Sequence, residues 1–487
     1  MKNIDIPVGI SNFAEIRKNK YYYIDKTGLI EELLKTTATK VTLITRPRRF
    51  GKTLGMSMLE NFFDIRKDSK LLFEGLEIAD KQALCEAWMN QYPVIFLSLK
   101  SVDGNDFSTA YSQLAYEIGA LYKEHDYLLE SPVLGEEEKK LFWQIKERKT
   151  GKIEVMRSLQ ILSQLLNKHY KKEVILLIDE YDVLIAKATS NGYYKEMLEI
   201  MKGLMQALKD NPLLRFAVIT GCLKIAKESI FTGTNNFVSD TITDTKLNEY
   251  FGFVQSEVDQ ILKDADFTDK ADLVKKWYDG YRFGDFDVYC PWDVMCYLRD
   301  LVYKPEAKPA SYWRNTSDNS IIRSFIDYAG SSITNKLETL MDGGYIIQKI
   351  DENLTYDYLH SSEDNLWSML YLTGYLTQKK GIEYQSEFYH AFLSGIFTGA
   401  GYQVQSNKEH GEGRSDIVVC DSLNGRVAIF EAKRITLLKN LETECDKALR
   451  QIDERMYAKD FEDAYDQVLC YGIAFFKKRC MVKRKES

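Results

Sequence analysis

Short apolar runs alternate with longer amphipathic stretches through the first half of the chain. Four runs are rich in β-branched residues and bounded by turn or charged residues: 41–45, 93–99, 174–178 and 216–220. Runs of this length and composition are typical of strands buried on both faces of a parallel sheet. Helix-period patterns separate them, at 55–64, 109–124, 155–170 and 195–209. The alternation predicts an α/β fold with a doubly wound parallel sheet.

The pattern changes after about residue 240. The stretch that follows is richer in helix-period patterning and in aromatic residues, and from about residue 386 the order becomes helix, hairpin, helix, strand. We therefore expect an α/β domain over 1–240, a helical middle domain over 241–370 and a small C-terminal α/β domain over 371–487. The length of 487 residues suits this division, because domains average roughly 100–200 residues.

Charge is distributed unevenly. Hydrophobic residues make up 45% and charged residues 28%, an ordinary globular composition, and the formal net charge is −7. The surface as a whole therefore does not attract nucleic acid. Basic residues cluster only locally, at Arg46, Arg48 and Arg49 and in the tail at 477–479 and 483–485. Such a cluster either holds phosphate or, in the tail, forms a solvated terminus.

Cysteine and histidine spacing excludes several metal-site classes. The eight cysteines include no C-x-x-C pair, and the five histidines show no H-E-x-x-H spacing. A zinc ribbon and a disulfide framework are therefore not expected. The N-terminus lacks the apolar segment of a secretory signal, and no apolar run approaches the ~18–20 residues that span a bilayer. These features favour a cytoplasmic protein without a membrane partner, and they do not indicate an oligomeric state.

The first predicted strand leads into a candidate phosphate-binding loop. The sequence Arg46-Pro47-Arg48-Arg49-Phe50-Gly51-Lys52-Thr53 follows that strand and opens a helix, which is the context such a loop needs. Backbone amides of the loop and the helix N-terminus would point at the β-phosphate. The expected nucleotide-binding residues are Arg48, Arg49, Phe50, Gly51, Lys52, Thr53 and Leu54.

Two side chains of the loop have specific expected roles. Lys52 supplies a point charge for the β- and γ-phosphates, and Thr53 offers its hydroxyl to Mg²⁺. The usual pattern G-x-x-x-x-G-K-[ST] has glycine where this chain has Arg46. Arginine fits there if it takes a negative φ, and Pro47 would stiffen the turn.

The strand at 174–178 ends in two carboxylates, Asp179 and Glu180. Asp179 would hold Mg²⁺ through water, and Glu180 would polarise the attacking water as general base. A strand–Gly-Lys-Thr–helix unit followed by a strand–Asp-Glu unit seldom arises by chance. The pair predicts an ATP site, since the guanine signature Asn-Lys-x-Asp is absent. Thr220, at the end of the fourth run, either senses the γ-phosphate or caps the next helix.

A second candidate site lies near the C-terminus. Two apolar runs, 413–420 and 426–433, flank a turn and predict a hairpin. Side chains alternate along a strand, so Glu431 and Lys433 share a face that Asp416 would reach from the partner strand. Two carboxylates suit Mg²⁺ or Mn²⁺, which activates water for phosphodiester cleavage. Lys433 would orient that water or neutralise developing charge.

Two further residues extend this site. Glu387, on the preceding predicted helix, would add a metal ligand, and Gln451, on the following one, would contact the metal-bound water or the substrate backbone. The bare pattern Asp…Glu-x-Lys also fits a solvated strand face. The prediction of a metal site here therefore depends largely on the helix–hairpin–helix context.

Several segments together resemble the bacterial AAA-ATPase-like proteins, whose members carry a C-terminal PD-(D/E)XK nuclease-superfamily domain. They are Tyr23-Ile24-Asp25-Lys26-Thr27, the loop from Arg46 to Thr53, Tyr278-Asp279-Gly280-Tyr281-Arg282-Phe283 and Tyr312-Trp313-Arg314-Asn315-Thr316-Ser317. The resemblance implies a P-loop NTPase sheet and a restriction-endonuclease-like C-terminal domain. In that family Arg-Pro-Arg-Arg-Phe-Gly-Lys-Ser/Thr is the usual loop, so Arg46 is expected.

Two functions stay open. In the first, ATP binding and hydrolysis control a metal-dependent nuclease with the catalytic set Glu180, Glu387, Asp416, Glu431, Lys433 and Gln451. In the second, ATP drives a switch whose C-terminal domain binds nucleic acid or protein without cleaving it. The aromatic residues 277–292 either stack on bases or pack between domains. The sequence does not distinguish DNA from RNA, and Arg48, Arg49 and Arg282 are equal candidates for an arginine finger.

Overall fold

A computed structural model describes residues 4–36, 38–209, 211–224, 237–312, 331–341, 344–348, 350–352, 354, 362–378, 402–410, 413–421, 424–434, 441–476 and 479–485. The chain forms two compact units. The first comprises Met1–Trp313 and Ile350–Gln378, and the second comprises Arg314–Lys349 and Lys379–Ser487. In the described part of the chain, no helix combines the length and apolar character that crossing a membrane requires.

A five-stranded parallel sheet organises the first unit, with strand order β2-β3-β4-β1-β5. Its strands are β1 (Val41–Thr45), β2 (Val94–Ser98), β3 (Val174–Asp179), β4 (Leu214–Gly221) and β5 (Phe237–Asp240). The four predicted strands are confirmed. The sequence did not reveal β5, because its four residues include only one that is buried. Since β4 lies between β1 and β3, the carboxyl ends of all three strands meet at one edge.

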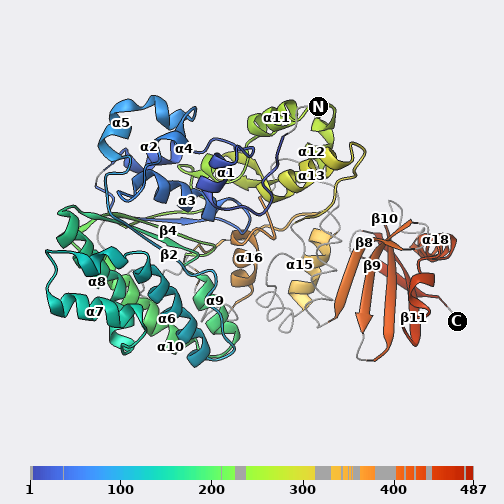
Figure 1. The fold of residues 1–487 in the computed structure, drawn as a ribbon. Helices are drawn as coiled ribbons and strands as arrows, with labels where there is room; N and C mark the ends of the chain where they lie inside the picture. The colour runs from blue at the N-terminus through green and yellow to red at the C-terminus, as the bar shows by residue number, and fades with distance from the viewer. Residues whose placement is uncertain are drawn as a thin grey trace. The chain divides into compact units, whose positions relative to one another are not determined.

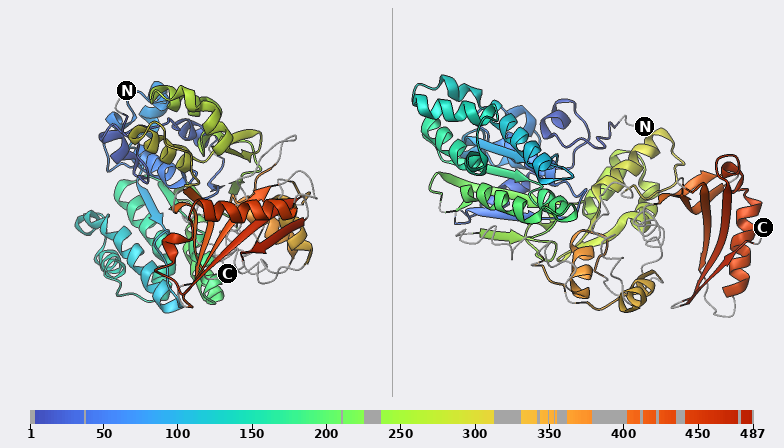
Figure 2. Two further views of the ribbon diagram at one scale, coloured as in Figure 1. Left: turned by 90° about the vertical axis from the view of Figure 1, so that its right-hand side faces the viewer. Right: turned by 90° about the horizontal axis from the view of Figure 1, so that it is seen from below.

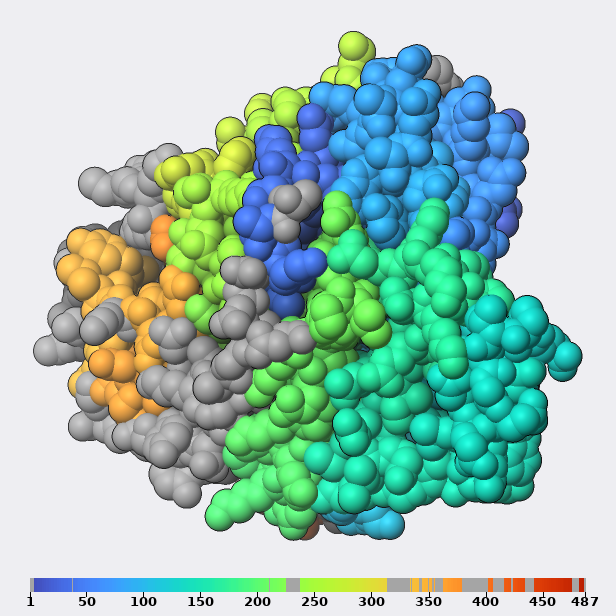
Figure 3. All heavy atoms as spheres, turned by 90° about the vertical axis from the view of Figure 1, so that its left-hand side faces the viewer, coloured from blue at the N-terminus to red at the C-terminus, as the bar shows by residue number. Residues whose placement is uncertain are grey.

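Helices cover both faces of this sheet, which confirms the doubly wound arrangement (Figure 1). Helix α3 (Lys52–Phe63) lies against one face, and α6 (Phe107–Lys123) and α8 (Lys152–Tyr170) lie against the other, with α10 (Tyr194–Leu204) packed on α8. The space-filling view shows this helical side of the unit largely as a teal and green surface (Figure 3). The remaining helical segments of this part are α1 (Phe13–Lys18), α2 (Gly28–Leu34), α4 (Lys70–Phe73), η1 (Glu77–Asp80), α5 (Gln82–Trp88), η2 (Asp126–Glu130), α7 (Glu136–Lys146), α9 (Val183–Ser190) and η3 (Met205–Leu208).

Burial explains why the apolar runs became strands. All six residues of β3 are buried, and Leu177 and Val218 pack with Phe62 and Phe63 of α3 in one cluster. Each such side chain contributes about 1.5–3 kcal/mol when removed from water. A polar residue is tolerated only where a strand ends, which is where Asp179 stands.

The middle segment is mainly helical but contains a hairpin. It consists of η4 (Asn248–Tyr250), α11 (Gln255–Asp264), η5 (Thr268–Lys270), α12 (Ala271–Tyr278), β6 (Asp279–Phe283), β7 (Phe286–Tyr289), α13 (Pro291–Tyr303) and α16 (Glu363–Leu372). Tyr278, Tyr289 and Tyr297 belong to its own apolar cluster. Helix-period patterning predicted the helices, whereas Gly284, with φ of 52°, closes the hairpin turn.

The second unit holds a mixed five-stranded sheet, in the order β12-β11-β10-β9-β8. Its elements are α15 (Ser331–Met341), β8 (Gln403–His410), β9 (Gly413–Asp421), β10 (Arg426–Arg434), α18 (Leu441–Glu454), η8 (Lys459–Phe461), β11 (Gln467–Phe476) and β12 (Arg479–Arg484). Helix α18 lies across one face of the sheet (Figure 2). The predicted hairpin is confirmed as β9–β10. Residues 479–484 of the basic tail form the edge strand β12, so this part of the tail is not frayed, although Val482 and Arg484 are exposed.

Arg46 ties the end of β1 to β5. Its side chain is fully buried, and it donates to the carbonyl oxygens of Thr45 (2.8 Å) and Asp240 (3.0 Å) and to Oδ1 of Asp240 (2.5 Å). The guanidinium also lies 5.3 Å from the ring centroid of Phe251. The arginine takes the negative φ that the sequence required. Arg46 therefore points away from the loop and stabilises the sheet edge beneath it.

Asp240→Leu is expected to destabilise the first unit by about 3–5 kcal/mol, because it leaves the buried Arg46 charge uncompensated. The double variant Arg46→Met with Asp240→Leu is expected to recover most of that loss, since it removes the charge together with its partner. The measurement is the urea-unfolding midpoint of both variants beside wild type. A double variant at least as unstable as the single one would show that the ion pair has no such role.

Candidate functional site

The loop between β1 and α3 turns at two residues with left-handed backbone. Arg49 has φ of 74°, and Gly51, which precedes the first residue of α3, has φ of 88°. A Cβ atom on Gly51 would meet nothing within 4 Å, so the glycine is needed for its backbone conformation and not for space. The helix then starts at Lys52, which places the loop at the helix N-terminus as the sequence predicted.

Lys52 points back into the loop. Its side chain is 3% exposed, and Nζ donates to the carbonyl oxygens of Arg46 (3.0 Å) and Pro47 (3.1 Å) and lies 3.3 Å from Oε1 of Glu180. Burial opposes the charged form, but the nearby carboxylates of Glu180, Asp182 and Asp179 help to outweigh it, and the pKa of Lys52 is raised. A buried, permanently charged ammonium at this position suits a polyphosphate ligand.

Asp179 joins the loop helix to two strands. Oδ2 accepts a hydrogen bond from the hydroxyl of Thr53 (2.8 Å), and Oδ1 accepts one from the hydroxyl of Thr220 (2.5 Å). Burial and the charge of Glu180 raise the pKa of Asp179, and the two hydroxyl donors oppose that shift. A buried carboxylate beside a threonine hydroxyl is the pair that holds Mg²⁺ in P-loop sites. The sequence-predicted residues Thr53, Asp179 and Thr220 thus meet at one point.

Glu180 follows Asp179 with an unusual backbone. Its φ is 54°, a left-handed value that a non-glycine residue seldom adopts, and Oε2 is buried without a hydrogen-bond partner among the described residues. Such a conformation costs of the order of 1–3 kcal/mol and is typical of functional sites. The strained turn aims the carboxylate at Lys52 and leaves one oxygen available to a ligand.

Asp182 is a residue of this region that the sequence motifs did not predict. It is buried, and its carboxylate accepts hydrogen bonds from the backbone N–H groups of Cys222 (3.0 Å) and Leu223 (2.9 Å). Burial, together with the charge of Glu180, raises the pKa of Asp182 to about 6. The spacing Asp179-Glu180-x-Asp182 was the signal available in the sequence. Asp182 fixes the chain that follows β4 next to Thr220.

The side chains of Arg49 and Phe50 turn away from the loop interior. The guanidinium carbon of Arg49 lies 4.0 Å from the ring centroid of Trp292, and Phe50 packs edge-on against Tyr281 at 4.9 Å. Phe50 also lies 5.0 Å from Phe283. We therefore expect any nucleotide contact of these two residues to come from the loop backbone. Tyr281, Phe283 and Trp292 pack against the loop, as the packing interpretation of the aromatic segment predicted.

The remaining predicted loop residues are Arg48 and Leu54. Both are partly buried, and they lie on either side of Gly51 and Lys52 in the sequence. Arg282 pairs with Asp287 at 2.7 Å on the hairpin. Of the three arginine-finger candidates, Arg48 and Arg49 thus belong to the loop itself, whereas Arg282 lies on the hairpin.

The segment that follows α16 also packs against the loop. A Cβ atom on Gly374, which follows α16 with φ of 86°, would lie 2.8 Å from Cβ of Pro47 and 3.5 Å from the Tyr281 ring. The backbone N–H of Arg282 donates to the hydroxyl of Thr377 at 3.0 Å. The outer side of the loop is therefore covered by the hairpin, α13 and the residues after α16.

In the second unit, β9, β10 and α18 bring four predicted residues together. Oδ2 of Asp416 accepts from the N–H of Ala432 (2.8 Å), and Nζ of Lys433 lies 2.9 Å from Oε1 of Glu431 and 2.5 Å from Oε1 of Gln451. Glu431 and Lys433 alternate with Ala432 along β10, so both face α18. This arrangement is the one the sequence predicted. Glu387 lies outside the described residues.

The fit of a divalent cation here rests on Glu431. The side chain is 3% exposed, and Oε2 is buried without a hydrogen-bond partner in the described part of the chain. Burial and the nearby charge of Asp416 raise the pKa of Glu431 to about 7, against the effect of Lys433. An orphaned carboxylate oxygen beside a second carboxylate suits Mg²⁺ or Mn²⁺. Among the described residues, however, no group of three or more His, Cys, Asp or Glu side chains forms.

Comparison with known proteins agrees with the two kinds of domain that the motifs predicted. The family described as "Predicted AAA-ATPase" matches residues 7–231, and the PD-(D/E)XK nuclease superfamily matches residues 385–485. A relative from Azotobacter chroococcum mcd 1, named "Uncharacterized protein in vnfD 5'region", is 26% identical over 319 residues. That match covers 65% of this chain and 55% of the relative, so the chain spans little more than half of that protein's length. By these matches the chain joins an AAA-ATPase-like domain to a domain of the PD-(D/E)XK nuclease superfamily, the architecture that its motifs predicted.

Proposed function

We propose that the first unit binds and hydrolyses Mg²⁺-ATP. The observation that carries the proposal is the meeting of Thr53, Asp179 and Thr220 beside the buried ammonium of Lys52. Backbone amides at the start of α3 and Lys52 would hold the β- and γ-phosphates. Thr53 and Asp179 would hold Mg²⁺, which supplies charge neutralisation on the phosphates when bound.

The residues around that point have complementary roles in the proposal. Glu180, aimed by its strained backbone, accepts a proton from the attacking water as general base. The hydroxyl of Thr220, which donates to Asp179, would sense the γ-phosphate by exchanging that hydrogen bond for one to a phosphate oxygen. This role is favoured over helix capping because the hydroxyl bonds Asp179. Lys52 exchanges its loop carbonyls for phosphate oxygens.

We further propose that the second unit cleaves phosphodiester bonds with a divalent cation. Asp416 and Glu431 would hold Mg²⁺ or Mn²⁺, which supplies an acidified water when bound. Lys433, kept in place by Glu431 and Gln451, orients the attacking water and offsets negative charge on the phosphate. Nucleic acid is the substrate class that fits this chemistry. Because both proposed sites lie on one chain, we propose that ATP regulates the cleavage.

The alternative is a switch that binds nucleic acid or protein without cutting. At this site the described residues supply the two carboxylates of Asp416 and Glu431, and the third expected ligand, Glu387, lies outside them. Incubating plasmid DNA or RNA with Mn²⁺ separates the two functions. Cleavage that Asp416→Ala abolishes supports the nuclease, and metal-independent binding without cleavage supports the switch.

Lys52→Ala is expected to lower the ATP hydrolysis rate by at least about 10²-fold, because it removes the positive charge that would stabilise the γ-phosphate in the transition state. The measurement is phosphate release at saturating ATP. Lys67→Ala is the matched control, since Lys67 is a more exposed lysine that pairs with Glu60, and it should hydrolyse ATP at the wild-type rate. Equal rates for Lys52→Ala and wild type would refute the site.

Tyr281→Ala is expected to weaken ATP binding severalfold, although Tyr281 does not touch the nucleotide. It removes the edge-on partner of Phe50, worth about 0.5–1.5 kcal/mol, and so loosens a loop that must be held in one conformation. The measurement is the Kd for ATP by calorimetry. Tyr303→Ala, at a tyrosine 85% exposed on α13, is the control, and equal affinities in the two variants would contradict the idea.

Mn²⁺ affinity of the second unit is expected to rise as the pH increases from about 6 to about 8. The pKa of Glu431 is raised to about 7, so the carboxyl is protonated at the lower pH and must lose that proton before it binds metal. In Glu431→Gln the dependence should flatten and the affinity should fall. The measurement is Mn²⁺ titration by calorimetry at each pH. An affinity in wild type that does not change with pH would count against Glu431 as a ligand.

A further inference from the structure

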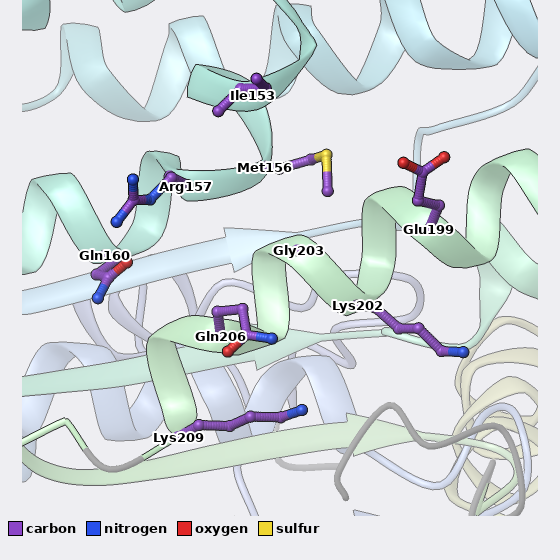
Figure 4. A pocket seen from close by; sticks show the side chains of 9 residues that line it. All are labelled: Ile153, Met156, Arg157, Gln160, Glu199, Lys202, Gly203, Gln206 and Lys209. Carbon is purple, nitrogen blue, oxygen red and sulfur yellow. The ribbon is translucent and has the colours of Figure 1, made fainter. Parts of the chain in front are cut away.

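A surface pocket, called the groove below, lies in the first unit on the side of α8 and α10. Its pocket has a volume of about 540 Å³ and lies between α8 and the continuous stretch formed by α10 and η3 (Figure 4). The residues that line it are Ile153, Met156, Arg157, Gln160, Glu199, Lys202, Gly203, Gln206 and Lys209. None of them belongs to either site described above.

Gly203 sets the depth of the groove. A Cβ atom on this residue would lie 2.5 Å from Cε and 2.6 Å from Cβ of Met156, so only glycine lets α10 approach α8 this closely. The close crossing gives the groove a small apolar floor. Its walls are the polar side chains on either side of that crossing.

The walls are basic. Arg157, Lys202 and Lys209 have no ion-pair partner within the described ranges, whereas Glu199, the acidic side chain in the lining, pairs with Lys152 at 2.7 Å. This concentration of cations stands out in a chain with a net charge of −7. Like charges gathered without carboxylate partners create a positive local potential that attracts an anion.

The spacing of these cations suits a linear polyanion. Positions 199, 202, 206 and 209 recur at three and four residues and so share one side of the helical stretch. Lys202 and Lys209 are therefore roughly 10–12 Å apart along the axis, at ~1.5 Å per residue in α10 and ~2 Å per residue in η3. A nucleic-acid strand carries one charge per ~3.4 Å, so the two lysines match phosphates about three steps apart.

We propose that the groove between α8 and α10 binds the phosphate backbone of nucleic acid. Arg157, Lys202 and Lys209 neutralise phosphates, and the amides of Gln160 and Gln206 donate hydrogen bonds to phosphate and sugar oxygens. The lining includes no aromatic side chain, so bases do not stack here and binding is independent of sequence. The lining favours nucleic acid over an acidic protein segment, because it places two neutral amide donors among the three cations. Such donors suit the phosphate and sugar oxygens of a nucleic-acid backbone.

The groove is separate from the nucleotide site. Residue Lys209 lies just before the amino end of β4 at Leu214, whereas Thr220 and the loop lie at the carboxyl end of the same sheet. Nucleic acid would thus bind without displacing ATP. Because binding here needs neither ATP nor a metal, it is measurable even if both proposed activities are absent.

The test is fluorescence anisotropy of a labelled single-stranded oligonucleotide and of its duplex, in EDTA and without ATP, over a range of salt concentrations. The variant is Arg157→Gln, Lys202→Gln, Lys209→Gln in the full-length chain. Affinity should fall, and the slope of log K against log salt should decrease by about 2, since each phosphate contact contributes about 0.7–0.9. Thermal unfolding at the wild-type temperature confirms that the variant is folded.

The matched control is Lys100→Gln, Lys123→Gln, Lys140→Gln, which removes the same charge from exposed lysines elsewhere on the unit. It should keep the wild-type slope. Equal affinities and slopes for the two triple variants would overturn the proposal, because the effect would then be one of total charge. Binding of poly-glutamate but of neither oligonucleotide would assign the groove to an acidic protein and overturn it as well.

Discussion

The proposed nucleotide site depends on the buried carboxylate of Asp179. Its two oxygens accept hydrogen bonds from Thr53 on α3 and Thr220 on β4, and these bonds fix the relative positions of a helix and two strands. The strand order makes this possible, since β4 separates β1 from β3 and brings three carboxyl ends to one edge. A buried carboxylate is costly unless it is paired. Here the hydroxyl donors and the nearby Lys52 offset that cost.

The same loop links the site to the middle segment. Its inner side holds Lys52 and faces Asp179 and Glu180, while its outer side carries Pro47, Arg49 and Phe50 against the hairpin, α13 and the residues after α16. Two motifs separated by more than 200 residues in the sequence, the loop and the hairpin around Tyr281, are therefore in contact. A change in loop conformation on nucleotide binding would reach the middle segment directly through these rings.

The sequence predicted the sheet, its helices and most of the site, because each rests on local pattern: buried runs for strands, a glycine before Lys52, carboxylates at a strand end. It did not predict β5, the Arg46–Asp240 pair or the outward turn of Phe50. Those features join residues nearly 200 or more positions apart. The local pattern of apolar and polar residues does not indicate contacts between residues so far apart in the sequence. The sequence could have indicated Asp182 by its fixed spacing from Asp179. Its role, however, depends on its hydrogen bond to the backbone of Leu223 after β4, which the sequence does not show.

The central claim is that Asp179 and the loop form one site for nucleotide and Mg²⁺. The most direct measurement is the affinity for ATP with and without Mg²⁺, in wild type and in Asp179→Asn, which keeps the size of the side chain. The account predicts that Mg²⁺ strengthens ATP binding in wild type and has little effect in the variant. The same gain from Mg²⁺ in both proteins would contradict it.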